Sequence, residues 1–214
     1  MNRIFYIAPL LLLLPAVGAA APLLFYSKYF KGSVPEFTAI TVERSGQTTY
    51  QEAKDDDNPI HVQMTEAETQ QMFDLAEKLE RFQHPIESGL KVANMGTKTF
   101  RFENGTEKHE VQFNYSLDTA AQALLECFER IAETEQDFIA LDRAAHYDKL
   151  GVNDALLELE ISLDHKRLVA AQQFLPLLDR IAKNESYLHI ARERAASLSE
   201  TIRKPPPPQE KPQP

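Results

Sequence analysis

The chain has 214 residues, 43% of them hydrophobic and 26% charged, and its formal net charge is −9. This composition is ordinary for a globular protein, and the length allows one domain or two small ones. The acidic excess is concentrated in residues 37–136, where 19 acidic side chains outnumber 9 basic ones. An acidic surface repels phosphate backbones, so we do not expect a nucleic-acid partner.

The N-terminal residues 1–20 have the pattern of a secretory signal peptide. Arg3 supplies a positive charge, residues 4–14 are apolar, and small residues suited to signal-peptidase cleavage stand at 18–20. This pattern predicts a periplasmic or secreted protein. A membrane anchor formed by residues 4–26 is the alternative, because apolar character continues that far and such a segment is long enough to span a bilayer.

The residues after the signal predict strands and a helix. We expect the aromatic run at residues 22–36 to pack on the domain; the alternatives are that it contacts a membrane or forms the tail of an anchor. In residues 37–54, apolar and polar residues alternate on the two sides of a turn, which predicts a β-hairpin. Residues 60–64 predict a further short strand. Thr65 with Glu68 has the spacing of a capping box, which predicts that a helix begins here.

A second hairpin is predicted over residues 97–115. Its centre is Asn104-Gly105, a dipeptide that suits a type I′ turn. That turn places Phe100 opposite His109 on the apolar face of the hairpin. His109 is then either packed against aromatic rings or functional, and both interpretations remain open.

An apolar stripe with 4-3-4-3 spacing predicts one long helix over residues 117–150. A polar seam at residues 133–137 interrupts the stripe near its middle. We expect Ser116 to cap the helix and Gly151 to end it in a left-handed conformation. Three more helices are predicted after it, followed by a Pro-rich, disordered tail at residues 204–214.

Together these elements predict an α+β fold, in which antiparallel β-hairpins pack on two helices and an all-α helical bundle follows. We expect a sheet domain at residues 37–136 and a helical domain at residues 137–203, joined through the long helix. Cys127 is the only cysteine, so no internal disulfide can form and the hydrophobic core must stabilise the fold unaided.

Catalytic motifs are absent from the sequence, which has no nucleophile elbow, zinc-protease motif or glycine-rich phosphate loop. We therefore predict no catalytic residues and no cofactor. Asp142 and His146 are four residues apart and share one face of the long helix, which makes them candidate metal ligands. A solvated helix pair is the simpler interpretation of the same spacing.

The loop at residues 85–97 is the best candidate for a binding surface. It contains Leu90, Val92 and Met95 between two glycines, and it joins the predicted sheet. Apolar side chains on a loop positioned by a sheet are typical of a protein-binding surface. The alternative interpretation is that these three side chains cover the core.

Two fragments, residues 89–100 and 148–152, resemble exported bacterial proteins to which no activity is assigned. The order of hairpin, helix, hairpin and helix, with the ITVERSG stretch at residues 40–46, also loosely resembles the emfourin-type inhibitors of thermolysin-like proteases. This second resemblance implies an inhibitor-like module, and it identifies no inhibitory residue in this chain.

The first functional hypothesis is an exported, non-enzymatic binding or scaffold protein with a protein partner. The second is an inhibitor-like module against secreted metalloproteases. The third is a metal-dependent hydrolase built on Asp142 and His146.

Overall fold

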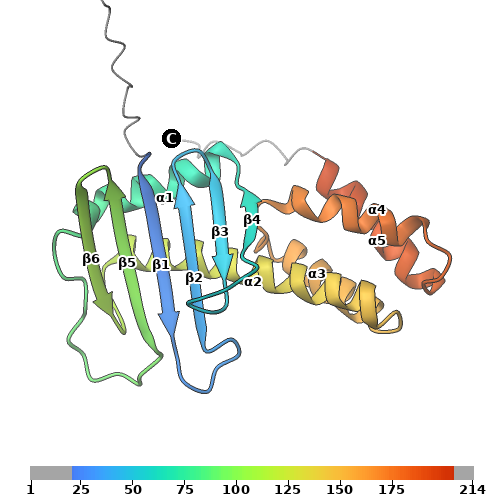
Figure 1. Cartoon of the computed structure of the whole chain (residues 1–214), viewed down its shortest axis with the longest axis horizontal. Coiled ribbons are helices and arrows are strands. Elements are labelled where there is room, and N and C mark those ends of the chain that lie inside the picture. The colour runs from blue at the N-terminus through green and yellow to red at the C-terminus, as the bar shows by residue number, and fades with distance from the viewer. Residues whose placement is uncertain (1–20, 205–214) are drawn as a thin grey trace, which may run out of the picture.

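The computed structural model describes residues 21–204, so the predicted signal peptide and nearly all of the predicted tail lie outside the described residues (Figure 1). Six strands form one antiparallel sheet in the order β4-β3-β2-β1-β5-β6. The strands are β1 (Leu23–Tyr29), β2 (Phe37–Glu43), β3 (Gln47–Gln51), β4 (Ile60–Gln63), β5 (Thr97–Asn104) and β6 (Glu107–Phe113).

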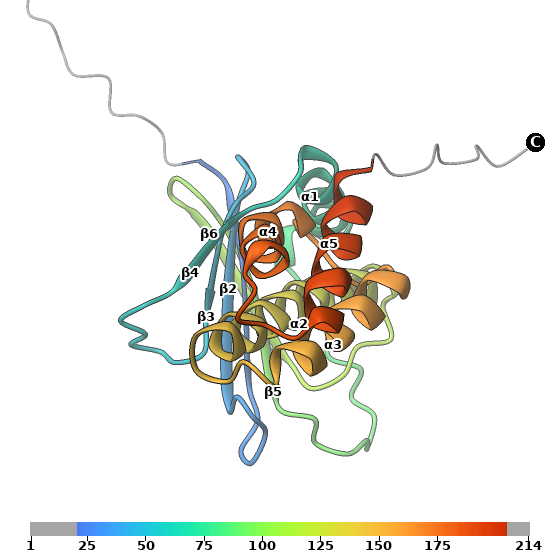
Figure 2. The same cartoon turned by 90° about the vertical axis from the view of Figure 1, so that its right-hand side faces the viewer.

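The helices are α1 (Glu66–Lys78), α2 (Thr119–Tyr147), α3 (Val152–Asp164), α4 (Leu175–Lys183) and α5 (His189–Arg203), with short 3₁₀ turns η1 (Glu80–Phe82) and η2 (Ala171–Phe174). Seen edge-on, the sheet has α1 and α2 on one side (Figure 2). The helices α3, α4 and α5 lie around the C-terminal end of α2 (Figure 1). No helix of residues 21–204 covers the opposite face of the sheet. The structure therefore confirms the predicted α+β class with a helical C-terminal part.

The aromatic run at residues 22–36 packs on the domain in a specific way, because it contributes β1 to the middle of the sheet. Leu24 and Tyr26 point toward the helices and are fully buried. The sheet thus begins earlier than the predicted boundary at residue 37, and the last four residues of the predicted 4–26 segment lie in β1. Within the described residues, no helix has the length and apolar character needed to cross a membrane.

The predicted register of the β5–β6 hairpin is wrong by two residues. Phe100 lies opposite Val111, and His109 lies opposite Phe102. Asn104 remains in the strand, and Gly105 takes the first turn position with φ +60°, as a type II′ turn requires. Because side chains alternate with a period of two, this shift leaves every side chain on its predicted face.

The long helix α2 is continuous through residues 133–137, as predicted, but both of its ends differ from the prediction. Asp118 is the cap, and its Oδ1 accepts hydrogen bonds from the amides of Ala120 at 2.7 Å and Ala121 at 3.1 Å. At the other end Tyr147 is the last helical residue and Asp148 is the C-cap, and Gly151 has φ −72° instead of a left-handed conformation.

Two hydrophobic clusters share α2. The first joins the helix-covered face of the sheet to α1 and to the N-terminal half of α2, up to Ile131. The second joins α3, α4 and α5 to the C-terminal half of α2, beginning at Leu141. The polar seam lies between these two clusters, so α2 connects a sheet layer to a helical bundle.

Candidate binding surfaces

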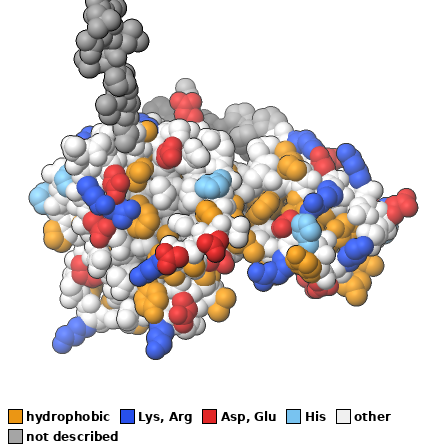
Figure 3. Space-filling view, viewed as in Figure 1, with side chains coloured by type: hydrophobic (Ala, Val, Ile, Leu, Met, Phe, Trp, Pro, Cys, Tyr) orange, Lys and Arg blue, Asp and Glu red, His pale blue; other side chains and the backbone are white. Residues whose placement is uncertain are grey.

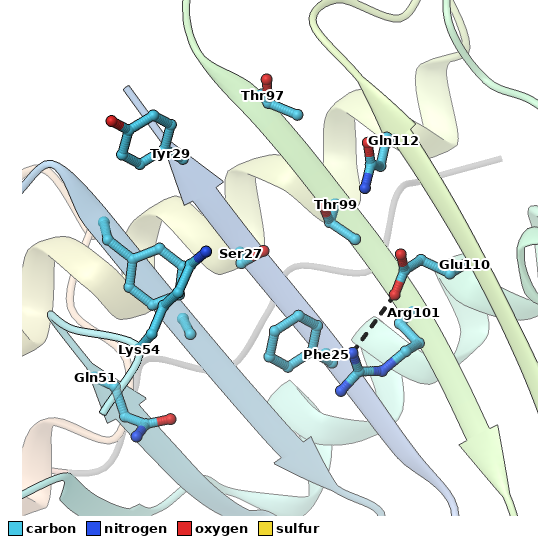
Figure 4. Close-up of a pocket in the computed structure, with 12 residues that line it drawn as sticks. Phe25, Ser27, Tyr29, Gln51, Lys54, Thr97, Thr99, Arg101, Glu110 and Gln112 are labelled. Atoms are coloured by element: carbon cyan, nitrogen blue, oxygen red, sulfur yellow. Dashed lines mark hydrogen bonds and ion pairs between the residues drawn. The ribbon is translucent and has the colours of Figure 1, made fainter. Parts of the chain in front are cut away.

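A shallow hollow of about 590 Å³ lies on the face of the sheet away from the helices (Figure 4). Strand alternation explains which residues of β1 line it. Leu24, Tyr26 and Lys28 point toward the helices, so Phe25 and Ser27 between them must point to this face. The hollow is lined by Phe25, Ser27, Tyr29, Phe37, Ala39, Gln51, Lys54, Thr97, Thr99, Arg101, Glu110 and Gln112. The set combines aromatic rings with uncharged hydrogen-bonding groups and a few charges.

Arg101 forms a fixed platform at one end of this hollow. Its guanidinium carbon lies 3.9 Å from the centre of the Phe25 ring, a cation–π contact. The Arg101 Nε lies 2.8 Å from the Glu103 carboxylate, and the Nη1 lies 3.5 Å from that of Glu110. Because the stack and the ion pairs constrain one guanidinium, its position is fixed by the surrounding side chains.

The loop at residues 85–97 is held in place by Asn114, the residue directly after β6. The amide of Met95 donates to Asn114 Oδ1 at 2.8 Å, and Asn114 Nδ2 donates to the carbonyl oxygen of Ala93 at 3.0 Å. The backbone amide of Asn114 in turn donates to Glu87 Oε2 at 2.6 Å. That hydrogen bond lowers the pKa of the Glu87 carboxyl.

Leu90, Val92 and Met95 are 52%, 44% and 56% exposed. The structure therefore does not use them to cover the core, which was the alternative interpretation. We refer to these three residues as the loop patch. Seen from the open side of the sheet, the surface of the molecule carries separate hydrophobic areas among its charged groups (Figure 3). That the loop patch binds a partner remains a prediction.

Gly96 attaches the end of this loop to β1. Its φ is +94°, and a Cβ there would lie 2.8 Å from both the carbonyl oxygen of Tyr29 and the Cβ of Phe30. Thr97 follows directly, pairs with Tyr29 across the β1–β5 ladder and lines the hollow. The loop that carries the patch therefore joins the sheet directly beside the hollow, with Gly96 between Met95 and Thr97.

Asp142 and His146 lie together on α2, as their spacing predicts. His146 Nδ1 is 3.3 Å from Asp142 Oδ1 and 2.8 Å from the Asp142 carbonyl oxygen. Arg180 Nη2 approaches the same carboxylate oxygen at 3.5 Å. Within residues 21–204, no group of three or more His, Cys, Asp or Glu side chains could hold a metal ion. Asp142 and His146 are neighbouring, half-exposed side chains on the surface of α2.

Two residues of the polar seam, Thr134 and Glu135, form a buried junction that the sequence did not reveal. Glu135 is fully buried, and its Oε1 accepts a hydrogen bond from Gln173 Nε2 at 2.9 Å. Its Oε2 has no hydrogen-bond partner among the described residues. Burial raises the pKa of this carboxyl to about 7. Thr134, also buried, accepts a hydrogen bond from the amide of Val169 at 3.2 Å.

A second hollow, of about 350 Å³, lies beside α2 on the helix-covered side of the sheet. Lys28 and Glu129 line it, and Lys98 lies directly opposite Lys28 in the β1–β5 ladder. Burial raises the pKa of Glu129 and lowers that of Lys98, whose Nζ donates to the carbonyl oxygen of Asn114 at 2.8 Å. These charges interact at the rim of the first hydrophobic cluster.

No known family model matches this chain, and no curated protein matches it.

Proposed function

We propose that this chain is an exported, non-enzymatic binding or scaffold protein whose protein partner contacts the loop patch. The observation that carries the proposal is that Leu90, Val92 and Met95 are half exposed on a loop fixed by Asn114. A loop that is already ordered loses little conformational entropy when a partner covers it. Apolar side chains presented in this way are typical of interaction sites.

The placement of the loop also supports a binding role. It ends at Gly96 against β1, the strand at the middle of the sheet, so the sheet fixes its position. Functional loops on rigid scaffolds are a recurrent arrangement in binding proteins. The helical bundle joined through α2 gives the protein a second surface, which is the scaffold part of the proposal.

Location outside the cytoplasm is part of this proposal and rests on the signal-like residues 1–20. The mature protein is then periplasmic or secreted. If the segment is not cleaved, an anchor would have to end before β1, because Leu24 and Tyr26 are required in the sheet.

We expect the double substitution Leu90→Asp and Met95→Asp to reduce partner capture about tenfold or more, since it places two charges in an apolar contact. Because both side chains are half exposed, the stability of the variant should stay within about 1 kcal/mol of the original protein. The measurement is capture from a periplasmic extract with quantitative mass spectrometry, together with thermal unfolding of the purified variant.

The matched control is Ile190→Asp on α5, which is 54% exposed and belongs to the helical bundle. It should capture the same proteins as the original chain. Equal capture by the loop variant and the control would contradict the proposal. A large loss of stability in the loop variant would also contradict it, because it would show that Leu90 and Met95 are structural.

An inhibitor of secreted metalloproteases is the second candidate function. The observation in its favour is that the loop at residues 85–97 is tied to the sheet through Asn114, and an inhibitory loop must likewise be held in a fixed conformation. We expect a panel of secreted metalloproteases to include one that is inhibited at about micromolar protein. Inhibition should be lost in the Leu90→Asp and Met95→Asp variant, and no inhibition across the panel would remove this candidate.

A further inference from the structure

The hollow on the open face of the sheet combines two kinds of group that suit one class of ligand. Aromatic rings come from Phe25, Tyr29 and Phe37. Hydrogen-bond donors come from the amides of Gln51 and Gln112 and from Lys54 (Figure 4). Aromatic-lined grooves with interspersed donors are the sites at which extended proline-rich segments dock.

Proline-rich segments match such a site for a physical reason. A proline residue has no backbone N–H, so the segment presents carbonyl acceptors and apolar rings. It also favours the polyproline II conformation before it binds, which lowers the entropy cost of docking. The donors of the hollow can therefore hydrogen-bond to these carbonyl groups, and its aromatic rings can pack on the pyrrolidine rings.

This chain carries a segment of that kind at its own C-terminus. Residues 204–214 read KPPPPQEKPQP, with four consecutive prolines and one charge of each sign near the end. In polyproline II conformation these 11 residues would span about 34 Å at roughly 3.1 Å per residue. The charges at Glu210 and Lys211 have counterparts in Lys54 and Glu110, which both line the hollow.

We infer that the hollow binds the proline-rich segment, residues 204–214, of a second copy of this chain. The position of α5 favours a second copy over the same chain. This helix ends at Arg203 on the helix-covered side of the sheet, whereas the hollow is on the opposite side (Figure 2). If two copies exchange their segments, each hollow is filled and a closed two-fold dimer results.

Sedimentation of the mature full-length protein should show a concentration-dependent dimer, and deletion of residues 205–214 should make it a monomer. A labelled synthetic peptide of residues 204–214 should then bind the deleted protein saturably, as measured by fluorescence anisotropy. The same peptide with alanine at positions 205–208 should bind about tenfold more weakly, because it loses both the preformed conformation and the ring contacts.

The site is tested with two tyrosine substitutions in the deleted protein. Tyr29→Ala removes an aromatic wall of the hollow and should weaken peptide binding about tenfold. Tyr147→Ala removes a tyrosine that is 87% exposed at the end of α2 and should leave binding unchanged. Equal effects of the two substitutions would overturn the assignment of the site.

Two other results would also overturn the inference. A full-length monomer whose truncated form still binds the peptide would show that the segment docks on its own chain. A dimer that survives the deletion would show that another surface associates. The Leu90→Asp and Met95→Asp variant separates this inference from the proposed function, because it should retain peptide binding whether or not it loses its partner.

Discussion

Replacing Glu135 with glutamine should make the protein more stable at pH 8, by about 3 kcal/mol, and should remove the fall in stability that this one carboxyl causes between pH 4.5 and 7. Glu135 is fully buried between the two hydrophobic clusters and has one hydrogen bond, from Gln173. A charged carboxylate is poorly solvated there, whereas a neutral amide of the same shape is not penalised in this way.

The direction of the effect follows from the pKa of Glu135. Burial raises that pKa from 4.5, the value expected in the unfolded chain, to about 7 in the folded protein. The folded state therefore binds more protons between these two pH values, and stability falls as the pH rises. The contribution of protonated Glu135 is fully present below pH 4.5 and is lost as the pH rises through about 7.

Urea unfolding at pH 5, 6, 7 and 8 measures this effect, with Glu200→Gln as the matched control. Glu200 is exposed on α5, so its substitution should leave the pH profile of the original protein unchanged. If Glu135→Gln has the same pH profile as the control, the carboxyl is not held in its buried environment in solution. A stability difference between Glu135→Gln and the control that shrinks from pH 5 to pH 8 would contradict the assigned sign.

The buried role of Glu135 shows what could not be predicted from the sequence. The spacing on α2 identified residues 133–137 as a polar interruption of an apolar stripe, and it correctly predicted one continuous helix. The groups that enclose the seam are Val169 and Gln173, which are more than 30 residues away in the chain. Periodicity describes one helix at a time, so it cannot show that a distant connection covers these polar groups.

Strand β1 was missed for a different reason. Its sequence, LLFYSKY, continues the apolar run of the predicted signal, so no change in composition marks where the strand begins. In the sheet the same residues alternate, with Leu24 and Tyr26 toward the helices and Phe25 toward the open face. Because β1 supplies Phe25 and Tyr29, the hollow could not be predicted without this strand.

The sequence left open whether Leu90, Val92 and Met95 cover the core or form a surface, but the loop itself was predictable, since glycines between two predicted elements indicate one. Its fixed conformation was not. The fixing residue, Asn114, looks in the sequence like an ordinary residue at the end of a strand, and its bonds to Ala93 and Met95 depend on how β6 ends beside the loop. The turn at Gly105 shows a similar limit, because this glycine can be the second central residue of a type I′ turn or the first of a type II′ turn, and the two give different registers.

We expect Gly96→Ala to destabilise the protein by about 3 kcal/mol. Gly96 lies in the chain between Met95 of the loop patch and Thr97 of the hollow, and its backbone packs closely on Tyr29 of β1. Part of this cost is the positive φ of +94°, which side chains disfavour. The remainder comes from the new Cβ, which would lie 2.8 Å from the Tyr29 carbonyl oxygen and must push β1 and the loop apart.

Gly89→Ala separates these two contributions. Gly89 also has a positive φ, of +69°, but a Cβ there meets no described atom within 4 Å. Its substitution should cost only about 1 kcal/mol, the strain of the backbone conformation alone. Chemical unfolding of both variants measures the difference, and equal losses would show that the contact of Gly96 with β1 is not tight in solution. If the contact is tight, Gly96→Ala should also weaken both partner capture and peptide binding, because Met95 and Tyr29 lie on either side of it.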